Sequence, residues 1–379
     1  EVSASDDEVF KNPTSWIHGI MLTLGSSAVS GYYDSVRLYG AQARQVFMQA
    51  AASHWQAPFD ELQTEAGSVI HQSSSRRLRY GELLSFINPD TELPKITEAD
   101  LKKESDFKII GSDIPRCDLP EKVNGTALYS IDAQLPGMLF ATVLHSPVKG
   151  AKPLSVKNQK KIEARKDVLS VIKLPDAVAV VGKTYEAAYL AEKELDIQWS
   201  RFEKLADYSD SKGLETHLQM VRDTKLEGMP IQKEGDVVAA LAKSENTYEA
   251  EYLSDYLYHA QIEPLNALAD VKTDGKSVEV WAGTQAPTHC VRSIASELGI
   301  KVDAVNLHRT YLGGGFGRRG SMDQEFVIDA VQLSKQMKSP VKVIWSREAD
   351  VKIGRFKPIK AMSLRAGEDA KGKLIAWHH

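Results

Sequence analysis

The strongest chemical signal in the sequence is a run of eight residues, Gly313-Gly314-Gly315-Phe316-Gly317-Arg318-Arg319-Gly320, called here the glycine segment. Glycine takes positive φ at little steric cost and lets a ligand approach the backbone closely. Four glycines within five positions, ahead of a predicted helix, therefore favour a loop whose amides bind oxygen atoms. A tight bend is the alternative, but the embedded aromatic residue and the two arginines favour a binding site.

The glycine segment matches neither common nucleotide motif. It has no G-K-[ST] sequence, so it is not a P-loop, and it does not fit G-x-G-x-x-G with an acidic partner. Ser321 and Gln324 have the spacing of a capping box, which predicts that a helix begins there. The apolar pattern continues this helix to about Lys338.

Gln285 is predicted to follow a strand, just before Pro287 opens a helix. Its amide can both donate and accept hydrogen bonds. If the strands before Gln285 and before Gly313 are parallel neighbours, both loops open at one carboxyl edge, where ligands bind in open α/β sheets. Taken alone, a glutamine at this place more often caps its own helix.

Weaker signals lie elsewhere. The small and hydroxyl residues Gly25, Ser26 and Ser27 precede a predicted helix and could cradle phosphate, although the same composition suits any solvent loop. Glu263 lies in an apolar setting and is either a catalytic base or a buried structural acceptor, of which we favour the second. His259 is expected to be a satisfied core histidine.

The elements around these residues predict an α/β (mixed α+β) fold of three domains. Residues 1–105 contain an apolar helical stripe from Val36 to Ala50, expected to pack in a core, and a hairpin over 69–79. Residues 106–205 read as strands at 168–172, 177–181 and 196–199 with a helix at 185–195. Residues 206–379 begin within a polar stretch (203–236). Beyond it the sequence predicts a strand at 247–252, two strand–loop–helix passages and a strand at 341–345.

Composition excludes several classes of protein. The 379 residues carry a net charge of −4, without the basic excess of a nucleic-acid binder. No apolar run is long enough to span a bilayer, and the compartment stays open between the bacterial cytoplasm and periplasm. Cys117 and Cys290 form no C-x-x-C pair, which argues against an iron–sulfur cluster or a cysteine-bound zinc in this chain.

The segment Thr284-Gln285-Ala286-Pro287, followed by the glycine segment, resembles the large subunit of molybdenum hydroxylases of the xanthine dehydrogenase and aldehyde oxidase family. Residues 112–125 and 135–147 look like the opening of that family's hammerhead domain. The pair Arg318-Arg319, and a stretch over 23–44 placed ahead of the hammerhead unit, are similar to the family branch that contains the beta chain of isoquinoline 1-oxidoreductase. The three ranges would then be part of a molybdenum-cofactor domain, the hammerhead domain and the first molybdenum-cofactor domain.

This resemblance implies roles for residues and a cofactor, molybdenum with molybdopterin in its cytosine dinucleotide form. Gln285 would hydrogen-bond an oxo ligand on molybdenum, and Phe316 would line the metal centre with it. Cofactor-binding positions would be Gly25, Ser26 and Ser27 for the dinucleotide phosphates, and Gly313, Gly314, Gly315, Gly317 and Arg318 near the metal. No side chain need be a metal ligand.

The complete enzyme implied by the resemblance hydroxylates an isoquinoline-like N-heteroaromatic ring or an aldehyde, with water as the oxygen source. Electrons would pass to a small iron–sulfur subunit. The family's glutamate base lies in a Gly-Glu-Pro-rich loop, and neither Gly81-Glu82 nor Gly367-Glu368 has that context. We therefore expect a piece of a longer subunit, partnered by its remaining segments and incomplete as an active site. A cofactor-free binding or assembly module and a nucleotide-binding protein are the alternatives.

Overall fold

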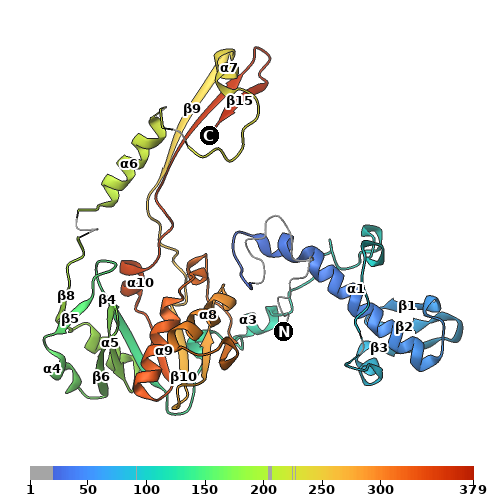
Figure 1. Ribbon diagram of the computed structural model, residues 1–379, viewed down its shortest axis with the longest axis horizontal. Coiled ribbons are helices and arrows are strands. Elements are labelled where there is room, and N and C mark those ends of the chain that lie inside the picture. The colour runs from blue at the N-terminus through green and yellow to red at the C-terminus, as the bar shows by residue number, and fades with distance from the viewer. Residues whose placement is uncertain (1–19, 91, 204–206, 224, 227) are drawn as a thin grey trace. The chain divides into compact units, whose positions relative to one another are not determined.

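A computed structural model of the chain describes residues 20–379 except 91, 204–206, 224 and 227. The chain divides into two compact units, with the boundary between Ala127 and Leu128 (Figure 1). The division into three domains, with boundaries at 105/106 and 205/206, stays a prediction. The boundary between the two compact units lies at 127/128.

The first unit is built on a long helix, α1 (Ser27–Trp55), which packs on a small antiparallel sheet. The other elements of this unit are β1 (Leu62–Glu65), β2 (Ser68–His71), β3 (Arg76–Arg79), α2 (Tyr80–Leu83) and α3 (Leu119–Asn124). Ala51, Leu62 and Val69 form its core, and the predicted hairpin is confirmed as β2–β3. The predicted apolar stripe is only partly correct, because Ala50 is buried whereas Val36 is 62% exposed.

A mixed sheet organises the second unit (Figure 1). It has seven strands in the order β12-β11-β10-β13-β4-β7-β6. Its strands are β4 (Leu139–His145), β6 (Val168–Lys173), β7 (Ala177–Gly182), β10 (Asn266–Val271), β11 (Val278–Ala282), β12 (Val305–Arg309) and β13 (Val341–Ile344). The pairs β11–β12 and β13–β4 are parallel, and the other neighbours are antiparallel. One sheet thus joins strands from both sides of the predicted boundary at 205/206.

The central strands are apolar along most of their length because both faces of the sheet are covered. All six residues of β7 and all four of β13 are buried. On one face, α8 (Pro287–Leu298) and α9 (Glu325–Met337) contribute Ile294, Phe326 and Leu333 to the main core. Each such side chain stabilises the fold by about 1.5–3 kcal/mol relative to an exposed one.

The other face at β6 and β7 carries a second core formed by α4 (Gln159–Glu163) and α5 (Tyr185–Glu192). The Thr184 hydroxyl caps α5 by accepting a hydrogen bond from the Ala187 amide. The predicted strand–helix–strand passage over 177–199 is present, but its last strand, β8 (Ile197–Trp199), does not join the large sheet. It pairs instead with β5 (Pro153–Val156).

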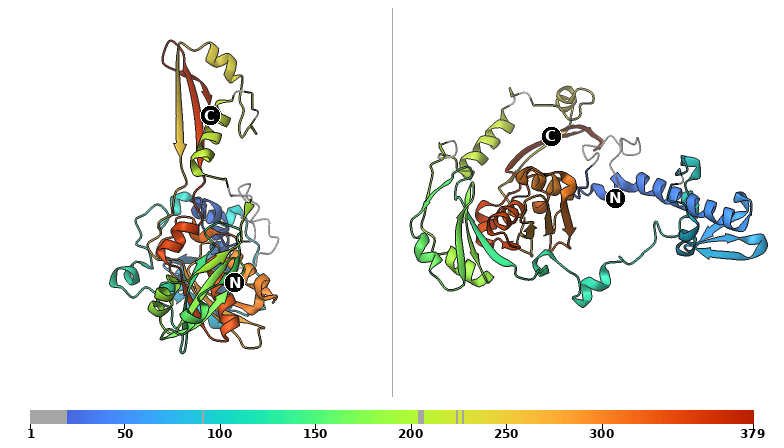
Figure 2. Two further views of the ribbon diagram at one scale, coloured as in Figure 1. Left: turned by 90° about the vertical axis from the view of Figure 1, so that its left-hand side faces the viewer. Right: turned by 60° about the horizontal axis from the view of Figure 1, so that its bottom comes forward.

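A third, antiparallel sheet has the order β15-β14-β9, with β9 (Asn246–Ser254) and β14 (Lys360–Glu368) running as a long ribbon (Figure 2). The edge strand β15 (Leu374–His378) pairs with β14. Within the polar stretch 203–236, the helix α6 (Asp210–Arg222) forms with Ser209 as its cap. The remaining helices of this unit are α7 (Val237–Ala242) and α10 (Arg347–Ile353).

The start of α9 differs from the sequence prediction. The helix begins at Glu325, and Gln324 has a φ of 47° without making a side-chain cap. The Gln324 amide donates to the carbonyls of Arg319 and Ser321, and the Ser321 hydroxyl donates to Glu325. The predicted capping box is therefore wrong, because the Gln324 amide binds carbonyls at the end of the glycine segment and does not cap the helix.

Candidate functional site

Gln285 and the glycine segment meet at the carboxyl edge of two parallel strands. Gln285 follows β11 and the segment follows β12, and the two strands pair in parallel from Val278 opposite Val305 onward. The amide of Gly317 donates to Oε1 of Gln285 at 3.0 Å, and the amide of Gln285 donates to the Arg319 carbonyl at 3.1 Å. The predicted proximity is confirmed, and the backbone contact ties the two loops together.

The conformation of the segment requires several of its glycines. Gly314 and Gly317 have φ values of 99° and 100°, a region that other residues rarely adopt. A Cβ on Gly313 would lie 2.2 Å from Cβ of Glu263, and one on Gly315 would lie 2.6 Å from Oε1 of Gln285. Gly315 is therefore required by close approach, whereas Gly314 and Gly317 are required by their backbone torsions.

Phe316 adopts a positive φ of 52°, and its side chain is 63% exposed. A bulky residue in this region is strained by roughly 1–3 kcal/mol. Strain of this kind persists where the surroundings over-determine the backbone, and such positions cluster at functional sites. The predicted contact position Phe316 therefore stands at the exposed tip of the segment.

The backbone of the segment presents donors. Among the residues that the structure describes, the amides of Gly314, Gly315 and Phe316 find no protein acceptor. Three successive free N–H groups at the carboxyl edge of a sheet suit an oxygen-rich, anionic group. This donor set fits the oxygen ligands of a molybdopterin-bound metal, as the resemblance implies.

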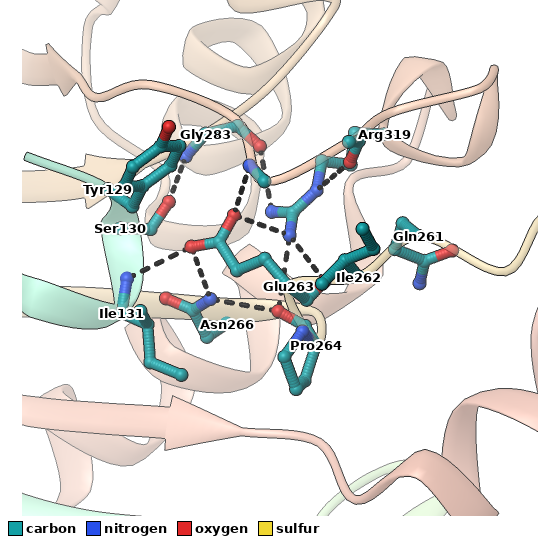
Figure 3. Close-up of polar contacts among 12 residues, drawn as sticks. Tyr129, Ser130, Ile131, Gln261, Ile262, Glu263, Pro264, Asn266, Gly283 and Arg319 are labelled. Atoms are coloured by element: carbon teal, nitrogen blue, oxygen red, sulfur yellow. Dashed lines mark hydrogen bonds and ion pairs between the residues drawn. The ribbon is translucent and has the colours of Figure 1, made fainter. Parts of the chain in front are cut away.

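Arg319 and Glu263 form a buried ion pair below the segment (Figure 3). Nη2 of Arg319 lies 2.9 Å from Oε2 of Glu263, and both side chains are almost fully buried. Arg319 also donates to the carbonyls of Gly314, Gly283 and Pro264, all near 3.2 Å. Burial lowers the pKa of Arg319, while Glu263 opposes this shift. One side chain thus connects the glycine segment, the loop after β11 and the start of β10.

The other partners of Glu263 establish its structural role. Its Oε2 accepts the amide of Gly313 at 2.9 Å, and its Oε1 accepts the Ile131 amide at 3.0 Å and Nδ2 of Asn266 at 3.1 Å (Figure 3). With the Arg319 guanidinium, four donors thus engage the two oxygens of this carboxylate. The interpretation of Glu263 as a buried acceptor is confirmed.

Arg318 points into the interior of the unit. Its side chain has no exposed surface, with Nε 3.2 Å from Oδ1 of Asp350 and Nη1 2.7 Å from Oε1 of Glu325. Its guanidinium also lies 5.6 Å from the ring centre of Trp345. Its predicted role in cofactor binding stays a prediction, and the geometry indicates that its charge is balanced by carboxylates within the fold.

Asp350, on α10, is the buried centre of a second network. Its Oδ2 accepts hydrogen bonds from the Tyr258 hydroxyl at 2.6 Å and from the Gln261 amide. Its Oδ1 binds Arg318, so the segment 258–261 and the glycine segment share one anchor. Neither Asp350 nor the central place of Arg319 could be predicted from the sequence, because neither carries a local motif.

His259 is not the core histidine that the sequence predicted. It is half-buried, its Nδ1 lies 2.9 Å from the Arg355 carbonyl, and its ring lies beside Gly317. Its neighbour Ala260 has a φ of 54°. The chain therefore turns here, between the residues that bind Asp350 and the ion pair of Glu263 with Arg319.

The remaining predicted residues, Gly25, Ser26 and Ser27, lie in the first unit at the start of α1. Gly25 and Ser26 have φ values of 60° and 55°, and the Ser27 hydroxyl donates to the Leu24 carbonyl at 2.7 Å. This local bond forms a turn before the helix. Their role in phosphate binding stays a prediction.

Other chemistry finds little support among the residues that the structure describes. No group of three or more His, Cys, Asp or Glu side chains that could hold a metal ion occurs there. None of the helices in this part of the chain combines the length and apolar character needed to cross a membrane. Cys117 is exposed, and burial raises the pKa of the Cys290 thiol to about 12, so that Cys290 stays protonated at neutral pH.

Comparison with known proteins identifies the class. Residues 221–379 match the family profile of the molybdopterin cofactor-binding domain. The chain is 33% identical to the beta chain of isoquinoline 1-oxidoreductase from Brevundimonas diminuta, over all of this chain and 52% of that protein. It is 30% identical to one of the chains of nicotinate dehydrogenase from Pseudomonas putida, over 94% of this chain and 30% of that protein. The chain thus spans about half or less of the length of these relatives.

The fold is shared with a solved structure, the Cu,Mo-CO dehydrogenase in its carbon monoxide reduced state. The TM-score is 0.55 at 19% identity, over 70% of this chain and 39% of that one. The solved structure shows a shared fold, and the family profile shows a molybdopterin cofactor-binding domain over residues 221–379. The chain belongs to the molybdenum hydroxylase family, and the beta chain of isoquinoline 1-oxidoreductase is among its relatives.

Proposed function

We propose that the chain forms part of the catalytic subunit of a molybdenum-dependent hydroxylase. The observation that supports this most directly is the 3.0 Å hydrogen bond between the Gly317 amide and Gln285, beside three amides that bind no acceptor in the described part of the chain. When bound, molybdenum with molybdopterin would supply the oxidation chemistry. The amides of Gly314, Gly315 and Phe316 would bind its oxygen ligands, and Gln285 would hold the loop in place.

We propose an N-heteroaromatic compound as substrate, with water as the oxygen source. The names of the two relatives, isoquinoline 1-oxidoreductase and nicotinate dehydrogenase, support this class, and an aldehyde is the second candidate. The exposed Phe316 ring would stack on a planar ring at the segment. Electrons would leave through a small iron–sulfur partner subunit, since the two cysteines of this chain cannot hold a cluster.

We propose the cytosine dinucleotide form of the pterin, with Gly25, Ser26 and Ser27 near its phosphates. Their position at the start of the 29-residue helix α1 supports this, because a helix N-terminus favours anions. Further segments of the same subunit would complete the site, including the glutamate that takes up a proton. Glu82 and Glu368 lack the Gly-Glu-Pro-rich context of that glutamate, and each is held by a hydrogen bond, from the Arg79 amide and the Tyr248 hydroxyl respectively.

The experiment is to purify the natural full-length subunit with its partner and to measure molybdenum, pterin and released cytosine nucleotide. Isoquinoline, nicotinate and an aromatic aldehyde are then supplied in ¹⁸O-labelled water with an artificial electron acceptor. Label in a hydroxylated heterocycle is the expected result. A subunit without molybdenum and pterin would favour the alternative, a binding or assembly module on the same fold.

A further inference from the structure

The tautomer of His259 is fixed by the backbone. Its Nδ1 lies 2.9 Å from the carbonyl oxygen of Arg355, which can only accept a hydrogen bond. Nδ1 therefore carries the proton, and Nε2 of the neutral ring presents a lone pair. This nitrogen is an acceptor whose direction is set by the fold.

Nε2 of His259 faces the glycine segment. A Cβ built on Gly317 would lie 3.5 Å from Nε2, so the imidazole edge borders this residue with no side chain between them. The segment itself offers donors, and the nearby Oε1 of Gln285 already accepts the Gly317 amide. His259 thus adds an acceptor beside a group of backbone donors.

Burial, aided by nearby positive charges, keeps His259 neutral. Burial lowers the pKa of His259 below its ordinary value of 6.5, and the positive charges of Arg318 and Lys357 lower it further. The Arg355 carbonyl and Asp350 act in the opposite direction but do not prevail. At neutral pH the ring is therefore uncharged, and Nε2 is available as an acceptor.

We propose that Nε2 of His259 accepts a hydrogen bond from a proton-bearing oxygen, a water or a hydroxyl, held at the amides of Gly314–Phe316. The site would then bind its ligand from two sides, with backbone donors and one imidazole acceptor. This inference rests on the proposed function and adds a contact residue to it. It also accounts for a half-buried histidine oriented by a backbone bond toward the segment.

The first test is chemical and does not depend on turnover. Diethyl pyrocarbonate acylates unprotonated imidazole nitrogens, and mass spectrometry locates the product. The full-length subunit is treated with and without its molybdenum cofactor. We expect that His259 is no longer acylated once the molybdenum cofactor is bound, whereas the rate of acylation of His217 stays the same. His217 is a matched control, because its Nδ1 also lies near a backbone carbonyl, that of Gly213 at 2.7 Å. Equal acylation of His259 in both forms would overturn the inference.

The second test is the pH profile of kcat/KM in the loaded enzyme complex. Protonation of His259 removes the acceptor, so wild-type activity should fall on the acidic side of neutrality. His259→Leu should lower kcat/KM about tenfold at pH 7. His259→Gln keeps an acceptor that does not titrate, so it should restore part of the activity and flatten the acidic limb. A profile unchanged in both variants would refute the role of His259, whereas a wild-type subunit without molybdenum would refute the proposed function itself.

Discussion

The guanidinium of Arg319 and the carboxylate of Glu263 lie 2.9 Å apart in the interior of the second unit. Through this pair, the glycine segment is anchored to the buried residues that lead into β10. Arg319 and the proposed ligand-binding amides belong to the same eight residues. Stability and function can therefore be separated by substitution at neighbouring positions.

Breaking this pair should destabilise the protein strongly. In Glu263→Gln the charge of Arg319 stays buried without a counter-ion, and we expect a loss of about 3–5 kcal/mol in the free energy of unfolding. Urea unfolding of the full-length subunit measures this. The matched control is Glu251→Gln, which breaks the exposed pair with Arg222 and should change little. A loss no larger than that of the control would contradict the structural role of Glu263.

Removing the side chain of Gln285 should affect activity more than stability. Gln285→Ala leaves the Gly317 amide without its acceptor, which costs about 1 kcal/mol of stability. If the loop positions donors toward the reacting group, activity per molybdenum should fall about 10²–10³-fold. Kinetics on metal-assayed protein test this prediction. Normal turnover per molybdenum in Gln285→Ala would remove this residue from the site.

Valine in place of Gly315 or Gly317 should abolish hydroxylation in the complete enzyme and leave the fold largely intact. The reasons differ, since Gly315 is crowded by Gln285 and Gly317 has a φ of 100°. Gly299→Val is the control, because Gly299 also has a positive φ, of 68°, but ends α8 away from the loop. It should lose roughly 1–3 kcal/mol of stability but keep its activity per molybdenum. If the loop variants behave like this control, the segment is only a bend.

Relief of strain at Phe316 should raise stability and lower activity. In Phe316→Gly the positive φ of 52° no longer opposes a side chain, so the protein should gain about 1 kcal/mol. The exposed ring is lost with it, and KM for a heteroaromatic substrate should rise. Phe316→Leu, which keeps both bulk and strain, serves as the comparison. A destabilised Phe316→Gly protein would show that the ring packs within the fold.

His145 should make stability depend on pH. Burial opposes its charge, but Asp329, 3.4 Å away, raises the pKa of His145 above 6.5 overall. The protonated form is thus favoured by folding, so its contribution is complete below pH 6.5 and is lost as the pH rises through the folded-state pKa. In His145→Gln, the free energy of unfolding should therefore no longer fall as the pH rises through the folded-state pKa of His145. An identical pH dependence in wild type and variant would contradict the prediction.

Much of the local structure could be predicted from the sequence. The strands β6 and β7 follow from runs of β-branched residues, and β11 and β12 from the two strand–loop–helix passages. The helix α8 follows from Pro287 at its start and Gly299 at its end. The meeting of Gln285 with the glycine segment was also predictable, because parallel neighbouring strands bring the loops at their carboxyl ends together.

What the sequence by itself determined is the set of local signals: strand and helix periods, the need for glycine, and the family. Only the tertiary structure decided which side chains neutralise which charges. Glu263 and Asp350 are 87 positions apart (350 − 263), yet they bind the adjacent residues Arg319 and Arg318. No local pattern encodes such pairs, because a buried charge is stabilised by whichever opposite charge the folded chain brings within contact. The same holds for His259, whose tautomer depends on a carbonyl 96 residues further along the chain.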